Sequence, residues 1–235
     1  MAHKYLILTD ACCDLPAERL NLPDVAVVPL PVTIGGHSFL SYPDEQEMSL
    51  KEFYQRLRDK QRGSTAAPSP EAYRQAALPA LERGLDVLYI GLGSALSATF
   101  ASGQMALAQL AAQWPQRRII CLDSMSGSLG QGLLVEMAIH AREQGQDIDA
   151  VAALIERHHL QVMHCFTVDD MQHLARSGRL SGYSALLASF LQFKPILWLS
   201  QEGKIRAIDR ARHAQGHGPD GGPGALGVFF LGTGR

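Results

Sequence analysis

Short apolar runs alternate with amphipathic segments along the first two thirds of the chain. Four runs have the length and composition of buried strands: 5–9, 25–29, 86–90 and 119–122. Segments of helical composition follow or separate them: 49–61, 71–83, 97–113, 129–144 and 148–158. Strands that alternate with helices at this spacing predict βαβ units on a parallel sheet. We therefore expect an α/β fold.

Two local patterns predict where helices begin. Ser49, with Glu52 three residues on, forms a capping box for the helix at 49–61. The expected apolar face of this helix is Leu50, Phe53, Tyr54 and Leu57. After the first strand, Asp14 as an N-cap or Pro16 in a first turn predicts the start of another helix.

Turn residues predict a hairpin and a loop around that helix. The runs 32–34 and 37–39 flank Gly35-Gly36, a pattern typical of a small hairpin. The polar stretch 63–70 contains Pro68 and Pro70 and is expected to be a loop.

The pattern changes after residue 158, and we expect two domains. The first, 1–158, is the α/β unit with the parallel sheet. The second, 159–235, is a smaller α+β unit, with strands at 162–167, 196–199 and 204–208 and short helices at 171–176 and 185–191. Glu202-Gly203 is a hairpin signal between its last two strands.

The composition excludes several classes of protein. The 235 residues carry 21 Lys+Arg and 23 Asp+Glu, a formal net charge of −2, and 7% are aromatic. A nucleic-acid-binding protein should show a basic stripe or stacking aromatics, so we expect no DNA or RNA partner. No apolar run approaches the roughly 18 residues of a membrane span, and the start lacks the pattern of a signal peptide. We expect a soluble, cytoplasmic protein with no transmembrane segment.

The cysteines and histidines lack recognised metal-ligand spacings. The cysteines are Cys12, Cys13, Cys121 and Cys165, without C-x-x-C spacing. The adjacent pair is interpreted as small loop residues, with a redox switch as the alternative. His158, His159 and His164 lack H-E-x-x-H spacing and are interpreted as structural or solvated. Asp10 and Asp14 could hold a metal, but a strand end and a cap explain them more simply. We expect no metal or other cofactor.

Three loops are expected at the carboxyl edge of the sheet, where ligands of open α/β folds bind. They are Thr9-Asp10 after the first strand, 94–99 after the third and 123–128 after the fourth. Hydroxyls and free N–H groups at helix N-termini favour an anion such as a carboxylate or phosphate. The alternative is that the serines only cap helices. These serines are Ser94, Ser97, Ser126 and Ser128.

The usual enzyme signatures are missing from these loops. Gly91-Leu92-Gly93 has Leu96 where a dinucleotide fingerprint needs its third glycine, and the chain holds neither a P-loop motif nor G-x-S-x-G. Farther along, Arg176 and Arg179 flank a glycine after a predicted short helix. They either bind a phosphate or carboxylate or lie on the surface at a helix end.

The order of several weak motifs resembles the DegV family of fatty-acid-binding proteins. The motifs are Leu8-Thr9-Asp10 with Asp14-Leu15-Pro16, Val28-Pro29-Leu30 with Val32-Thr33-Ile34, Thr65-Ala66-Ala67-Pro68-Ser69, Ser94-Ala95-Leu96-Ser97-Ala98-Thr99-Phe100, Asp123-Ser124, Val168-Asp169-Asp170, Ser177-Gly178-Arg179-Leu180-Ser181 and Lys194-Pro195-Ile196-Leu197. Each motif is weak, but their shared order extends over about 200 residues of this chain.

The resemblance implies a long-chain fatty acid buried between two domains. It implies that Thr65 and Ser97 hydrogen-bond the carboxylate and that Arg179 lies near the head group; Ser94, in the same turn as Ser97, joins these candidates. Some family members present the acyl chain to a fatty-acid kinase, so such a kinase is a possible partner. The helix faces Met105/Leu107/Leu110 and Leu186/Leu187/Phe190/Leu191 either line the acyl tunnel or belong to the core.

The chain departs from the family pattern at its loops and near its end. Ala66-Ala67 replaces Ser-Gln in the threonine loop, and Ala98 replaces a glycine in the serine turn. A family segment is missing between about residues 212 and 222, so the second domain is expected to be shortened. Asp220 stands where the kinase-coupled members have a histidine, which leaves the kinase role open.

We therefore expect a non-catalytic protein that carries or presents a long-chain fatty acid. One alternative is an enzyme that acts on a phosphorylated small molecule at the same serine-rich loops, although no general base is evident beside those serines. Another alternative is a partner-binding module whose shortened second domain cannot enclose a ligand.

Overall fold

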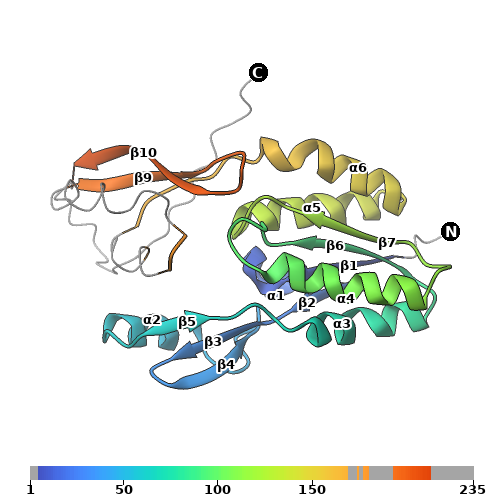
Figure 1. Ribbon diagram of the computed structural model, residues 1–235, viewed down its shortest axis with the longest axis horizontal. Coiled ribbons are helices and arrows are strands. Elements are labelled where there is room, and N and C mark those ends of the chain that lie inside the picture. Colours follow the sequence, from blue (N-terminus) through green and yellow to red (C-terminus); the bar gives the residue numbers. More distant parts are fainter. Residues whose placement is uncertain (1–4, 169–173, 175–176, 180–192, 213–235) are drawn as a thin grey trace. The chain divides into compact units, whose positions relative to one another are not determined.

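The computed structural model describes residues 5–168, 174, 177–179 and 193–212 (Figure 1). The chain divides into two compact units, Met1–His159 and Leu160–Arg235, which we describe separately. In the part of the chain that is described, no helix is both long and apolar enough to cross a membrane.

The first unit is built on a four-stranded parallel sheet, as the alternation of strands and helices predicts. Its strand order is β2-β1-β6-β7, with β2 at Val25–Val28, β1 at Tyr5–Asp10, β6 at Asp86–Gly91 and β7 at Ile119–Asp123. Every residue of β1 is buried. A strand buried on both faces reads as a continuous apolar run, because helices cover both sides of a parallel sheet.

Helices pack on both faces of this sheet (Figure 1). They are α3 (Pro70–Glu82), α4 (Thr99–Gln113), α5 (Leu129–Glu143) and α6 (Ile148–His158). Leu6, Leu8 and Tyr89 alternate along their strands and share a hydrophobic core with α3 and α4. The intervening Ile7 and Leu88 are fully buried as well.

The connection after β1 differs from the prediction that Asp14 is the N-cap of the next helix. The residues after β1 form a 3-10 turn, η1 (Ala11–Cys13), followed by a short helix, α1 (Ala17–Leu20). Asp14 ends η1 in the left-handed region at φ 50°, and Pro16 rather than Asp14 stands at the N-cap of α1. Asp14 therefore does not cap the helix, because the 3-10 turn takes up the residues directly after the strand.

A small antiparallel sheet interrupts the βαβ pattern, with the order β4-β3-β5. The predicted hairpin is confirmed as β3 (Leu30–Ile34) and β4 (His37–Ser41). The prediction of a loop over 63–70 is wrong in part, because β5 (Gly63–Thr65) pairs with β3 and places Thr65 opposite Val32. The open edge of β3 imposes this pairing on residues with little strand preference of their own.

Helix α2 (Leu50–Arg58) packs on this small sheet and is shorter than the predicted 49–61. Ser49 Oγ accepts the N–H of Glu52 at 3.1 Å, as the capping box requires. Only two members of the predicted apolar face, Phe53 and Leu57, pack against the cluster under the sheet. The other two, Leu50 and Tyr54, are 53% and 47% exposed, so the prediction is wrong for them.

The second unit contains a three-stranded antiparallel sheet in the order β10-β9-β8. Its described elements are η2 (His159–Gln161), β8 (Cys165–Phe166), β9 (Phe193–Leu199) and β10 (Ile205–Arg212). The predicted hairpin turn is confirmed, with Gly203 at φ 70°. The strand predicted at 162–167 is reduced to two residues. The helices expected at 171–176 and 185–191, the segment at 212–222 and Asp220 fall wholly or largely outside the described residues.

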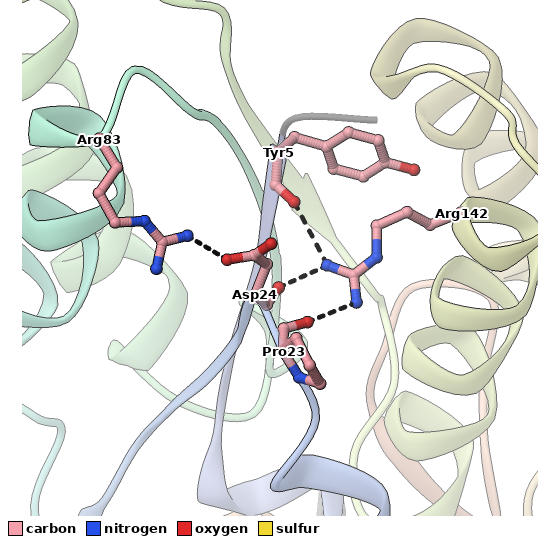
Figure 2. Close-up of polar contacts among 5 residues, drawn as sticks. All are labelled: Tyr5, Pro23, Asp24, Arg83 and Arg142. Atoms are coloured by element: carbon pink, nitrogen blue, oxygen red, sulfur yellow. Dashed lines mark hydrogen bonds and ion pairs between the residues drawn. The ribbon is translucent and has the colours of Figure 1, made fainter. Parts of the chain in front are cut away.

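Arg142 of α5 ties the amino edge of the sheet together (Figure 2). Its guanidinium donates to the backbone carbonyls of Pro23 at 3.0 Å, Asp24 at 2.5 Å and Tyr5 at 3.3 Å, and lies 5.9 Å from the centre of the Tyr5 ring. On the other side, Arg83 forms an ion pair with the Asp24 carboxylate. Arg142 therefore supplies donors to three backbone carbonyls at the start of the sheet, in addition to the hydrogen bond that the Asp24 carbonyl accepts from β1.

We predict that Arg142→Met lowers the free energy of unfolding by about 1–3 kcal/mol, because the partly buried carbonyls lose their donors. Urea denaturation at neutral pH measures this loss. Arg83→Met is the matched control: its ion pair is exposed, so the loss should stay below about 1 kcal/mol. Equal losses in the two variants would contradict this account of Arg142.

The same edge makes stability depend on alkaline pH. Burial raises the pKa of Tyr5 to about 12, whereas Arg142 opposes the rise. A phenol in an unfolded chain has a pKa near 10. Because the folded chain holds this proton more tightly, the stabilisation is complete below about pH 10 and is lost as the pH rises towards 12.

We predict that Tyr5→Phe reduces the fall in unfolding free energy between about pH 10 and pH 12 by about 1–2 kcal/mol. Denaturation curves of both chains at a series of pH values measure the difference in slope. The comparison at pH 7 is the control, since there the variant loses only the hydrogen bond from Tyr5 to the carbonyl of Gln146. An unchanged alkaline slope would contradict the prediction.

Candidate functional site

The loops after β1, β6 and β7 meet at the carboxyl edge of the parallel sheet, as predicted. The N–H of Leu92, after β6, donates to Asp10 Oδ2 at the end of β1 at 3.0 Å. The N–H of Gly93 donates to the carbonyl of Ser126, after β7, at 2.7 Å. Backbone hydrogen bonds therefore fix all three loops to one another.

Asp10 is the fully buried centre of this edge. Besides Leu92, its carboxylate accepts from the N–H of Cys12 at 3.2 Å, from Gln131 Nε2 at 3.2 Å and from the hydroxyl of Tyr89 at 3.3 Å. Burial raises the pKa of Asp10, and the hydrogen bonds from Leu92, Gln131 and Cys12 oppose the rise. These donors are the partners that a charged carboxylate requires inside a protein.

Two side chains that sequence reasoning did not single out extend this network. Gln131, near the start of α5, donates to Thr9 Oγ1 at 3.1 Å as well as to Asp10. Tyr73 of α3 places its hydroxyl 3.2 Å from that of Tyr89. Burial is the main cause that raises the pKa of both phenols, so both stay protonated. Gln131 and Tyr73 lie within helices, in stretches of sequence that contain no motif by which they could be recognised.

A second carboxylate, Asp123 at the end of β7, holds the other two loops. It accepts from the N–H of Ser94 at 3.2 Å and from that of Met125 at 2.9 Å. A Cβ at Gly93 would lie 2.9 Å from the nitrogen of Ser126, so only glycine allows this approach. Met125 and Ser128 have positive φ angles of 51° and 52°. Asp10 and Asp123 are thus structural anchors of the loops.

The predicted ligand residue Ser97 lies two residues before the start of α4 and is half-buried. Its Oγ accepts the N–H of Thr99 at 3.2 Å and lies 2.9 Å from Thr99 Oγ1. The first turn of α4 contains no acidic residue. Ser97 is therefore not the N-cap of α4, which is Ala98 without a side-chain hydrogen bond, and its hydroxyl lies near a helix N-terminus that lacks an acidic side chain.

The other three serines do not act as simple caps. Ser94 is exposed and uses its backbone N–H on Asp123. The N–H of Ser126 donates to Ser124 Oγ at 3.2 Å. Ser128 stands at the N-cap of α5 without a capping hydrogen bond from its side chain.

Thr65, the second predicted carboxylate ligand, ends β5 and is exposed. The loop after it is fixed at both sides: the N–H of Ala66 donates to the carbonyl of Pro31 at 3.0 Å, and Ser102 Oγ of α4 donates to the carbonyl of Pro68 at 2.5 Å. The threonine loop is therefore attached to the first turns of the helix that follows Ser97.

Arg179 belongs to the second unit. Its Nη1 donates to the carbonyl of Ser177 at 2.6 Å, and its N–H donates to Ser177 Oγ at 3.4 Å. Thr65, Ser94 and Ser97 all belong to the first unit. The predicted head-group residues are thus divided between the two units.

The state of the cysteines favours the interpretation of the adjacent pair as small loop residues over a redox switch. Those at 12, 13, 121 and 165 are all free. Burial raises the pKa of Cys13 to about 12 and that of Cys121 to about 11, so these thiols stay protonated at neutral pH. Among the residues that the structure describes, no three His, Cys, Asp or Glu side chains gather in a way that could hold a metal ion.

The parallel sheet, with loops fixed to one another at its carboxyl edge, defines an open α/β protein, and in folds of this class ligands bind at that edge. Within this class the chain belongs to the DegV family, because the family described as "Uncharacterised protein, DegV family" matches residues 4–217. The predicted resemblance is confirmed. A "DegV domain-containing protein" of Clostridium perfringens is 31% identical over 209 residues, which are 89% of this chain and 72% of that relative. One of Deinococcus radiodurans is 35% identical and is matched over 70% of its length.

Solved structures of similar fold are described as fatty-acid-binding proteins. A DegV family protein of Thermus thermophilus, described by its fatty-acid binding, has a TM-score of 0.77 and 34% identity, and the match covers 89% of this chain and 72% of that one. A fatty-acid-binding DegV family protein of Streptococcus agalactiae has a TM-score of 0.79 and 28% identity, with 90% and 73% covered. A stearic-acid-binding protein of Eubacterium ventriosum has a TM-score of 0.80 and 25% identity, with 89% and 71% covered.

We predict that Asp10→Asn lowers the free energy of unfolding by about 2–4 kcal/mol, since its amide nitrogen would face buried donors in place of an acceptor. Urea denaturation measures the loss. Asp123→Asn is the control, because Asp123 is only half-buried and should cost about 1 kcal/mol. A larger loss at Asp123 would show that Asp10 is not the main anchor.

Proposed function

We propose that this protein binds one long-chain fatty acid between its two domains and serves as a carrier or presenter rather than an enzyme. The observation that carries the proposal is the match to DegV proteins of Thermus thermophilus and Streptococcus agalactiae that are described as fatty-acid-binding. Both matches cover about nine tenths of this chain, and the family match over residues 4–217 spans the loops with Thr65 and Ser97.

In this proposal the hydroxyls of Thr65 and Ser97 donate hydrogen bonds to the fatty-acid carboxylate. Ser94 and Arg179 lie near the same head group. The start of α4 supports an anion there, because its N–H groups and dipole carry partial positive charge and its first turn holds no competing carboxylate. The hydrogen bond from Ser102 to Pro68 keeps the threonine loop at this helix.

The acyl chain supplies most of the affinity in this proposal. Burying some 14–16 methylenes at about 0.8 kcal/mol each contributes on the order of 10 kcal/mol before the entropy of binding is subtracted. A hydrogen bond to a charged group contributes about 1.5–3 kcal/mol. The hydroxyls therefore orient the ligand and select a carboxylate, and the tail makes binding tight. A fatty-acid kinase as partner and a cytoplasmic location remain predictions of the sequence.

We predict that Thr65→Val and Ser97→Ala each weaken the affinity for palmitate or oleate about 10-fold or more, because each removes one hydrogen bond to the carboxylate. Isothermal titration calorimetry on delipidated protein measures the dissociation constants. Ser64→Ala is the matched control, since it removes an exposed hydroxyl from the neighbouring position of β5 and should leave the affinity unchanged.

The rival function is an enzyme acting on a phosphorylated small molecule. It would be favoured if native mass spectrometry found no acyl ligand, if affinity did not rise from a twelve-carbon to a sixteen-carbon acid, and if Ser97→Ala abolished turnover of a phosphorylated compound. The proposal requires instead that longer chains bind more tightly and that the methyl ester, which has no charge, binds more weakly than the acid.

A further inference from the structure

Ser102 of α4 uses its hydroxyl outside its own helix. A serine within a helix commonly donates its hydroxyl to the carbonyl four residues earlier, which here is that of Ala98. That carbonyl accepts the backbone N–H of Ser102 at 3.0 Å. The Ser102 hydroxyl donates to the carbonyl of Pro68 at 2.5 Å, in the loop that follows β5. One side chain therefore joins the helix that follows Ser97 to the loop that follows Thr65.

The loop that receives this hydrogen bond is stiff. Pro68 is buried and its ring fixes its own φ, and Ala67, as the residue before a proline, is restricted to extended conformations. At the other end of the loop the N–H of Ala66 donates to the carbonyl of Pro31 at 3.0 Å. Because Thr65 directly precedes Ala66, a shift of Pro68 is passed along this short backbone to Thr65. The side chains of Ala66 and Ala67 carry no polar group that could fix the loop.

The segment after the loop is anchored on the same helix. Ser69 caps α3 with its side chain directly after Pro68. Helix α3 packs along α4 (Figure 1), and Gly103, the neighbour of Ser102, makes room for the Tyr73 ring, since a Cβ there would lie 3.0 Å from Tyr73 Cε1. The backbone after Pro68 is thus fixed by the core, and the strand before the loop by β3. The Ser102 hydrogen bond holds the piece of backbone between these two anchors.

We propose that Ser102 is a positioning residue of the fatty-acid site: by holding Pro68 against α4, it sets the place of Thr65 relative to Ser97. This role rests on the proposed function, in which those two hydroxyls share one carboxylate. The oxygens of a carboxylate stand at a fixed separation, and hydrogen bonds weaken outside a narrow range of distance and angle. Two donors from different segments hold such a group well only if the segments are tied to each other. Ser102 thus helps the site to select an ionised head group without touching the ligand.

Isothermal titration calorimetry on the delipidated full chain tests this role with two ligands of equal length, palmitate and 1-hexadecanol. Ser102→Ala should weaken palmitate binding roughly 3- to 10-fold, because the threonine hydroxyl is displaced rather than removed. Binding of the uncharged alcohol should change little. Ser102→Thr keeps the hydroxyl and should bind palmitate like the unaltered chain. A merely structural role of Ser102 would lower the affinity for both ligands alike.

A double-mutant cycle identifies the hydroxyl through which Ser102 acts. Added to Thr65→Val, Ser102→Ala should cause no further loss of palmitate affinity, because no threonine hydroxyl is left to position. Added to Ser97→Ala, it should cause nearly its full loss. Ser49→Ala is the matched control, since it removes a hydroxyl that caps α2 and lowers stability without touching the loop. It should leave palmitate affinity unchanged, and urea denaturation compares the stability of the two single variants.

A measurement without ligand separates this role from the proposed function. Hydrogen exchange of the Ala66 amide should be faster in Ser102→Ala than in the unaltered chain, because the loop loses one of its supports, and it should be unchanged in Ser49→Ala. Unchanged exchange in Ser102→Ala would overturn the role of Ser102, as would unchanged palmitate affinity, equal weakening of both ligands, or a further loss on top of Thr65→Val. An unaltered chain that binds neither ligand would overturn the proposed function itself, and the role of Ser102 with it.

Discussion

A buried carboxylate accepting hydrogen bonds from several directions is the interaction on which the candidate site depends. Asp10 ends the first strand, yet its partners come from the loop after β6, from the turn after β1 and from α5. A polar group at this depth is tolerated only when it is hydrogen-bonded. The hydrogen bonds therefore have two effects. They satisfy the buried side chain of Asp10, and they fix the conformation of the loops whose N–H groups donate to it.

The two edges of the parallel sheet are held by side chains of opposite kind, a basic one at the amino edge and acidic ones at the carboxyl edge. At the amino edge the guanidinium of Arg142 donates to three backbone carbonyls (Figure 2). At the carboxyl edge N–H groups of the loops are free, and Asp10 and Asp123 accept from them. Because the carboxylates occupy N–H groups of the three loops, the proposed site relies on the hydroxyls of Ser97 and of Thr65 in β5 to hold an anionic ligand.

The periodicity of the sequence predicted the parallel strands and the helices that cover them, because burial on both faces leaves a continuous apolar run. It failed where tertiary contacts override local preference. Gly63–Thr65 is polar and becomes a strand only because β3 has an open edge. Leu50 and Tyr54 match a core pattern, but the small sheet covers only Phe53 and Leu57. Gln131 and Tyr73 were missed because they act across the fold on Asp10 and Tyr89, and no local spacing records such contacts.

Helix α2 and the proposed ligand loop are parts of one continuous piece of structure. After α2 the chain passes through Lys60–Arg62 into β5, and β5 ends at Thr65. Pairing with β3 holds this short strand, and the hydrogen bond from Ser102 attaches the loop beyond Thr65 to α4. The position of Thr65 therefore depends on the small sheet on one side and on α4 on the other.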